Sequence, residues 1–325
     1  MTSAWTIHKS AAVLVAAAVL TPALVSTSAA AGQVPSRQIT GLTITQSAAA
    51  SGASVSLAAP KRVVPYRPFN VTVTATAPGR LVIDALRSGD KQSTVADQWV
   101  PAGTETLSVR TKWSDVRGLS ASLNQGTDGQ ASDELAVATK RSAYPVVGRV
   151  KHKELGSSWK PGCPAPAPVL RRININYTSY SGRTKRGEIV VHKRVVTTVK
   201  RAFRKAYKKD FRIKSMIPID RFGGSDNRSM RADNTSGYAC GKYESGRWAR
   251  HAYGDAVDIN PRRNPHVFPD RLLPGNAEAF VDRSNKRKGM LGRKNPVTRT
   301  FTKAGWTWGG DYRNPDYQHF SLTGG

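Results

Sequence analysis

The sequence has few acidic residues, few histidines and only two cysteines, and it lacks long apolar runs. Asp and Glu number 22 against 50 Lys and Arg, so the 325-residue chain has a formal net charge of +28. Its apolar run at residues 11–20, AAVLVAAAVL, is about half the length of a membrane-spanning helix. Two thiols alone cannot build a structural zinc site. Candidate metal ligands are therefore sought among its carboxylates and its six histidines.

The N-terminal residues are typical of a secretory signal peptide. A start that carries one lysine precedes the apolar run, and small residues at Ala29 and Ala31 follow it. The alternative is a membrane anchor, which the short apolar run disfavours. We predict a signal peptide over residues 1–31, no transmembrane segment after its cleavage, and a secreted, extracellular protein associated with the cell wall.

The positive charge is concentrated in the C-terminal part of the chain. From Lys151 onward there are 36 basic and 14 acidic residues. Such an excess attracts polyanions, and for an exported protein the candidates are anionic cell-wall polymers and lipid head groups. No pattern points to specific nucleic-acid binding. The alternative is a solvated basic surface that only aids solubility.

Composition divides the rest of the chain into three parts. Residues 36–139 contain short alternating runs such as FNVTVTATA, broken by Gly, Pro and Asp turns, which predict an all-β, immunoglobulin-like sandwich. Residues 140–161 are polar and basic and are predicted to be a linker. Residues 162–325 predict an α+β domain, an antiparallel sheet with helices. Cys163 and Cys240 lie in this domain and are either a disulfide pair, as export favours, or two free thiols.

The C-terminal domain begins with two predicted strands and a helix. VLRRININY at 169–177 and GEIVVH at 187–192 predict strands. Apolar residues recur at helical spacing between Lys193 and Phe211, which predicts an amphipathic helix with a basic outer face. The later Trp306 and Trp308 lie in a Gly-Trp-x-Trp-Gly-Gly stretch. They line a groove or pack in the core, and we expect the core for at least one.

The stretch HAYGDAVDIN at 251–260 holds the first candidate site residues. Val257 and Ile259 alternate with Asp258, so the strand would turn Asp258 away from the core. A Tyr-Gly turn would fold His251 over this strand, and a histidine that meets a carboxylate suits zinc. Asp255 stands at odd spacing from Asp258, which argues against its being a ligand.

A second pair lies near the end of the chain. His319 follows Asp316 by three residues in DYQHFSL, a strand-like stretch. This spacing puts a carboxylate near a metal ligand, where it can move a proton. The alternative is a structural His–Asp pair at a sheet edge.

These motifs together resemble the D-alanyl-D-alanine carboxypeptidase-like zinc peptidases of the M15 family. GCP, GEIVV, SMRADNTSGYACG, HAYGDAVDINPRRNP and GWTWGGDYRNPDYQHF occur in family order from about Gly162 to Leu322. That family includes vancomycin-resistance carboxypeptidases and phage L-alanyl-D-glutamate endolysins. The N-terminal β segment lies outside the resemblance.

The resemblance implies a Zn²⁺ ion held by His251, Asp258 and His319. It implies that Asp316 is the general base, where related sequences often have glutamate, and that Arg231 holds a substrate carbonyl or carboxylate. The sequence departs from the family where serine is common two residues before the first ligand, since Ala249 stands there. It also has YACG where relatives carry FNCR, and both changes affect substrate contacts.

The expected function is therefore a secreted zinc metallopeptidase that cuts peptidoglycan peptide stems. It would act as a D,D-carboxypeptidase or as an L-alanyl-D-glutamate-type endopeptidase. One alternative is a non-catalytic protein that binds cell wall or polyanions and keeps the fold as a scaffold. A nucleic-acid binder, resting on charge alone, is a further alternative.

Overall fold

The computed structural model describes residues 52–113, 115–126 and 129–324. The predicted signal peptide, and the start of the predicted sandwich at residues 36–51, lie outside the described residues. No helix among the described residues is both long and apolar enough to cross a membrane.

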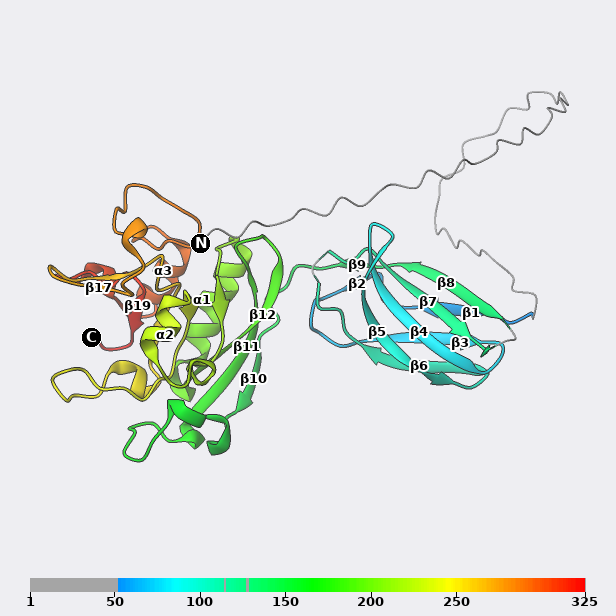
Figure 1. Ribbon diagram of the computed structural model, residues 1–325, viewed down its shortest axis with the longest axis horizontal. Helices are drawn as coiled ribbons and strands as arrows, with labels where there is room; N and C mark the ends of the chain where they lie inside the picture. The colour runs from blue at the N-terminus through cyan, green and yellow to red at the C-terminus, as the bar shows by residue number, and fades with distance from the viewer. Residues whose placement is uncertain (1–51, 114, 127–128, 325) are drawn as a thin grey trace, which may run out of the picture. The chain divides into compact units, whose positions relative to one another are not determined.

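The N-terminal described part is built from antiparallel strands in two sheets (Figure 1). One sheet has the order β1 (Val55–Ala58), β3 (Phe69–Ala75), β6 (Gly103–Val109), and the other β5 (Asp90–Val100), β4 (Gly79–Arg87), β7 (Gly118–Asn124), β8 (Gln130–Ala136). A short parallel pair joins β2 (Arg62–Val63) to β9 (Ala138–Thr139). Alternate side chains of both sheets enter one hydrophobic core that includes Val71, Leu81 and Leu119, all fully buried. This part is all-β, as the alternating runs predict; its likeness to immunoglobulin domains stays a prediction.

Strand β5 was not predicted from the sequence. It is an edge strand, and of its eleven residues only Val100 is buried. An edge strand with two solvated faces has no need for alternating apolar residues, so it leaves no period-two pattern.

The C-terminal part begins with a three-stranded antiparallel sheet of order β10 (Val146–Arg149), β11 (Leu170–Thr178), β12 (Thr184–His192). Strands β11 and β12 match the two predicted strands. The prediction that all of 140–161 is a linker is wrong for β10, which pairs along β11. Every residue of β10 is exposed, which explains why its sequence reads as a connection.

Helix α1 (Val196–Lys208) packs between β11 and α3 (Pro296–Thr302) in Figure 1. Its buried residues, which include Val199 and Phe203, follow the predicted helical spacing. They meet a second small sheet of order β15 (Ala256–Asp258), β19 (His319–Ser321), β18 (Thr307–Trp308) in one core. Trp306 and Trp308 are both buried in this core, so the core interpretation is confirmed for both.

Short elements connect this framework. They are α2 (Asp226–Arg231), the parallel pair β13 (Ser215–Met216) and β14 (Asn234–Thr235), and the hairpin β16 (His266–Val267) and β17 (Leu272–Leu273). The 3-10 helices are η2 (His152–Glu154), η3 (Gly156–Ser158), η4 (Ala167–Val169), η5 (Lys193–Val195), η6 (Ile219–Phe222), η7 (Arg250–Tyr253), η8 (Glu278–Phe280) and η9 (Gly309–Asp311). Antiparallel sheets with a few packed helices fit the α+β class expected for this domain.

Candidate metal centre

The pairing of β15 with β19 brings together residues that lie 61 positions apart. In the register of this antiparallel pair Asp258 stands opposite His319. His251 arrives from η7, and the chain then reverses at Gly254, whose φ of 71° lies in the left-handed region that glycine adopts without strain. A side chain at Gly254 would also collide with the backbone of His192 at 2.8 Å. The predicted turn therefore folds His251 over the strand that carries Asp258.

Three ligand atoms form a compact triangle. His251 Nε2 lies 3.2 Å from Asp258 Oδ1 and 3.3 Å from His319 Nδ1, and His319 Nδ1 lies 3.0 Å from Asp258 Oδ1. Ligand atoms about 2.0–2.2 Å from a tetrahedral ion are about 3.3–3.6 Å apart, so these separations lie at or just below the range. Among the described residues, this is the group of His, Cys, Asp and Glu side chains that converges closely enough to hold a metal ion.

The backbone fixes the orientation of His251. Its Nδ1 lies 2.6 Å from the carbonyl oxygen of Gly237, which accepts the Nδ1–H and leaves Nε2 facing the triangle. Gly237 must be glycine, because a Cβ there would lie 2.3 Å from the carbonyl oxygen of Val190. Asp258 is held by backbone hydrogen bonds of 3.0 Å in both directions with Ser236. These contacts preorganise two of the three side chains.

The electrostatics of the triangle favour a cation. Burial lowers the pKa of His251, but the Asp258 carboxylate outweighs burial and raises that pKa to about 10. Burial likewise raises the pKa of Asp258, while the charges and hydrogen bonds of His251 and His319 lower it below its ordinary value. A buried carboxylate that stays ionised beside two imidazoles is a donor set suited to a divalent metal ion.

Asp316 lies beside the triangle, three residues before His319. Its Oδ2 is 3.3 Å from His266 Nδ1, and its Oδ1 is buried without a hydrogen-bond partner among the described residues. Burial raises the pKa of Asp316 to about 7; the His319 charge opposes this rise and the Asp258 charge adds to it. A carboxyl group with a pKa near neutrality is suited to accept and return a proton.

Asp255 belongs to a different environment, as its spacing predicts. It is fully buried and forms ion pairs with Arg194 and Arg250, and it is absent from the metal-binding group. The stretch 251–260 therefore contains one carboxylate for the candidate site and one buried carboxylate that pairs with two partly exposed arginines.

The triangle and Asp316 open into a cavity of about 750 Å³. One wall is the loop 239–249, which folds back on itself through the pairing of Lys242 with Trp248. Cys240 starts this loop and forms a disulfide with Cys163, so the paired alternative for the two thiols holds in the structure. The disulfide ties the cavity wall to the start of the domain.

Arg231 does not reach this cavity. It is exposed at the end of α2 and is not among the lining residues, which corrects its predicted contact with substrate. The number of residues between Arg231 and His251 does not determine where the Arg231 side chain points. The cations that line the cavity are Lys242, Arg247 and Arg271. Arg271 pairs with Glu244 at 2.9 Å, and no side-chain partner of Arg247 is found among the described residues.

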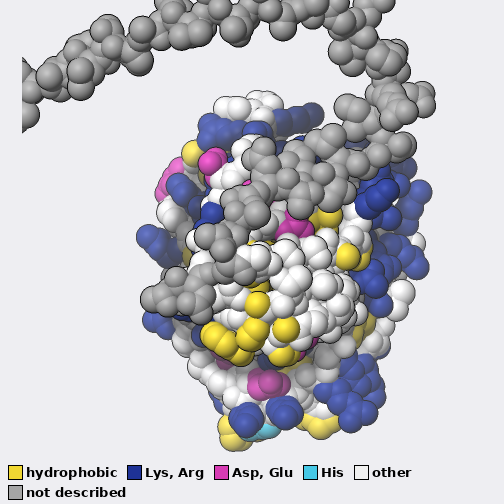
Figure 2. Space-filling view, turned by 90° about the vertical axis from the view of Figure 1, so that its right-hand side faces the viewer, with side chains coloured by type: hydrophobic (Ala, Val, Ile, Leu, Met, Phe, Trp, Pro, Cys, Tyr) yellow, Lys and Arg dark blue, Asp and Glu magenta, His cyan; other side chains and the backbone are white. Residues whose placement is uncertain are grey.

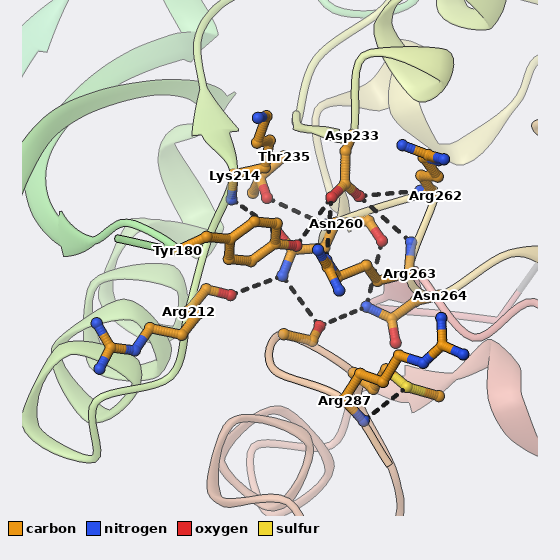
Figure 3. Close-up of polar contacts among 12 residues, drawn as sticks. Tyr180, Arg212, Lys214, Asp233, Thr235, Asn260, Arg262, Arg263, Asn264 and Arg287 are labelled. Carbon is orange, nitrogen blue, oxygen red and sulfur yellow. Dashed lines mark hydrogen bonds and ion pairs between the residues drawn. The ribbon is translucent and has the colours of Figure 1, made fainter. Parts of the chain in front are cut away.

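A buried polar network supports the end of β15 (Figure 3). Asn260, at a φ of 47°, donates to the carbonyl oxygens of Arg212 at 2.8 Å and Gly289 at 3.0 Å. Asp233 accepts from the Tyr180 hydroxyl at 2.8 Å and from the backbone N–H of Arg262 at 3.0 Å. This network was not predicted from the sequence, although a run of Asn and Asp after an apolar strand is a signal for such turns. It ties four segments to the strand that presents Asp258.

The donor set, the spacing of its atoms and the cavity all fit a resident metal ion. The model of a family described as D-alanyl-D-alanine carboxypeptidase matches residues 243–322, a range that contains the whole triangle and Asp316. No curated protein matches the sequence. Over residues 243–322 the C-terminal part of this chain is similar to the M15 peptidases.

Proposed function

We propose that this protein is a secreted zinc metallopeptidase that hydrolyses the peptide stems of bacterial peptidoglycan. The observation that carries the proposal is the triangle of His251, Asp258 and His319, with Asp316 beside it, at one cavity. This arrangement lies within the segment that matches D-alanyl-D-alanine carboxypeptidases. That match supports a peptide as the substrate, and the peptidoglycan stem is the proposed one.

The three side chains of the triangle would hold Zn²⁺ through His251 Nε2, Asp258 Oδ1 and His319 Nδ1. Two nitrogens and one oxygen leave a fourth position for water or substrate, as in catalytic zinc sites. When bound, zinc polarises the scissile carbonyl and lowers the pKa of the attacking water. The remaining chemistry belongs to the side chains of the protein.

Asp316 is assigned the role of proton carrier. Its Oδ1 is buried and has no hydrogen-bond partner among the described residues, so it is available to accept a proton from the attacking water. The same oxygen would then return that proton to the leaving amine. Its ionised form is favoured beside a bound cation, so Asp316 would begin the reaction as a base.

Substrate binding is assigned to the loop 239–249 instead of Arg231. Arg247 and Lys242 line the cavity, and their charge suits a carboxylate of a stem peptide. Lys242 also lies 4.5 Å from the ring centre of Trp248, which keeps its ammonium group on one side of the loop. Arg247 is the stronger candidate, because a guanidinium can bind a carboxylate through two N–H groups at once.

Export and wall association are part of the proposal. They are supported by the predicted signal peptide at 1–31, by the disulfide and by the net charge of +28. Figure 2 views the molecule from one side and has many Lys and Arg side chains with few acidic ones between them. Such a surface would hold the enzyme near anionic wall polymers by an attraction that weakens with salt.

Mass spectrometry of the products from zinc-loaded protein tests this function. Loss of the terminal D-alanine from a pentapeptide stem identifies a carboxypeptidase, and a cut within the stem identifies an endopeptidase. Asp316→Asn is the control, since it should bind zinc and lose about 10²–10⁴-fold in kcat. Zinc-loaded wild-type protein that leaves both the free stem and intact peptidoglycan uncut would refute the proposal and favour a binding role.

A further inference from the structure

His266 lies against the side of Asp316 that faces away from the unpartnered Oδ1. Its Nδ1 is 3.3 Å from Asp316 Oδ2. The two backbones are paired as well: Val267 N–H donates to the Pro315 carbonyl at 2.9 Å, and Tyr317 N–H donates to the Pro265 carbonyl at 3.2 Å. The residues on both sides of Asp316 are therefore fixed to the strand that carries His266.

Phe268 stacks on the ring of His266. The two ring centres lie 3.9 Å apart with the planes 29° from parallel, so the imidazole is stacked and cannot turn freely. The side chain of His266 is about a quarter exposed and lines the cavity. Burial lowers its pKa to about 4, which makes the imidazole neutral at physiological pH.

A neutral imidazole has one N–H and one lone pair. Beside a bound cation Asp316 is ionised. A lone pair on Nδ1 would then face the lone pairs of Oδ2, whereas an N–H on Nδ1 would point at that oxygen, 3.3 Å away. The packing therefore selects the Nδ1–H tautomer. One oxygen of Asp316 then has a donor, and the other, Oδ1, has no hydrogen-bond partner in the part of the chain that the structure describes.

We propose that His266 is a positioning residue for Asp316: its Nδ1–H holds Oδ2 and so directs Oδ1 toward the proton that it transfers. The inference rests on the proposed function for its catalytic consequence, while the His266–Asp316 pair itself stands on the packing. His266 is not one of the three residues of the metal-binding group, so its loss should spare the metal.

A set of variants separates positioning from folding. His266→Leu should lower kcat/KM about 10–100-fold, the usual effect of losing the partner that orients a site residue. His266→Asn should recover much of this loss, because its amide nitrogen can donate from nearly the position of Nδ1. Adding His266→Leu to Asp316→Asn should lower activity no further. Zinc per chain should stay at the wild-type value in every variant.

His152→Leu is the matched control. His152 also contacts an aromatic ring, that of Trp159 at 4.1 Å, but it does not line the cavity. Its replacement should leave kcat/KM unchanged. Independent effects of His266→Leu and Asp316→Asn, or equal losses in His266→Leu and His266→Asn with zinc retained, would overturn the proposal.

The tautomer gives a readout that needs no activity. Nitrogen-15 NMR of the histidine side chains should show the His266 proton on Nδ1 in the zinc-loaded wild type, where Asp316 is ionised. A proton on Nε2 would refute the pair even in an active enzyme. Conversely, an inactive protein with the Nδ1–H tautomer would refute the proposed function and leave the pair standing.

Discussion

Replacing Asp255 or Asp258 distinguishes the roles of the two carboxylates in the stretch 251–260. Asp255→Ala removes a fully buried carboxylate and leaves Arg194 and Arg250 without their shared partner. Breaking a buried ion pair on one side costs about 3–5 kcal/mol. The side chains of Arg194 and Arg250 are 50% and 20% exposed, so water recovers part of that loss. We expect the low end, about 3 kcal/mol.

Urea unfolding of the metal-free protein measures this loss. With a slope of about 2 kcal/mol per molar urea, the midpoint for the C-terminal domain should fall by about 1.5 M. Asp311→Ala is the control, because Asp311 pairs with Arg293 at the surface of the same domain and its loss should barely move the midpoint.

Zinc binding should depend on Asp258 and not on Asp255. Asp255→Ala should keep one zinc per chain when folded, since Asp255 does not belong to the triangle. Asp258→Ala removes a ligand atom. Losing a residue that only holds a ligand in place weakens metal binding about 10–100-fold, and the loss of Asp258 itself should weaken zinc binding more than that. Equal retention of zinc in the two variants, or its loss in Asp255→Ala alone, would refute the assignment of these carboxylates.

Three further predictions follow from the same contacts. Replacing Cys163 and Cys240 by serine opens a loop of 77 residues and should lower stability by up to about 4.5 kcal/mol in urea unfolding, with zinc retained. The raised pKa of His251 stabilises the metal-free fold fully below pH 6.5, so the midpoint should fall as pH rises toward 10, and Asp258→Asn should flatten that fall. Gly309→Ala places a Cβ 2.5 Å from the Asp316 carbonyl oxygen and should lower kcat at least tenfold without releasing zinc; unchanged kcat would contradict the packing.

Much of the triangle could be predicted because its information is local. The alternation of apolar residues around Asp258 predicted the strand face on which its side chain lies. The glycine turn predicted that His251 folds back over this strand. Both follow from strand geometry and from glycine's freedom at positive φ. The pairing of β15 with β19 is a long-range contact that periodicity does not encode. The placement of His319 beside Asp258 came from the family resemblance.

The parts that were missed depend on tertiary packing. His266 reads as a residue in a proline-rich loop, and its contact with Asp316 exists only because a two-residue strand pairs across 50 residues of chain. Arg231 was placed at the substrate by analogy, but the direction of a short helix decides where its last side chain points. Strand β10 was not predicted because all of its residues are exposed, so its sequence has no alternation of apolar and polar residues. Each of these cases needs the fold before the role can be assigned.

The most direct test of the account is stem-peptide hydrolysis measured as zinc is returned to chelator-treated protein. The account predicts no cleavage without metal and a linear rise in rate that saturates at about one zinc per chain. The triple change of His251, Asp258 and His319 to alanine should give no rise at any zinc concentration. Cleavage that survives complete removal of zinc, or none at full zinc occupancy, would contradict it.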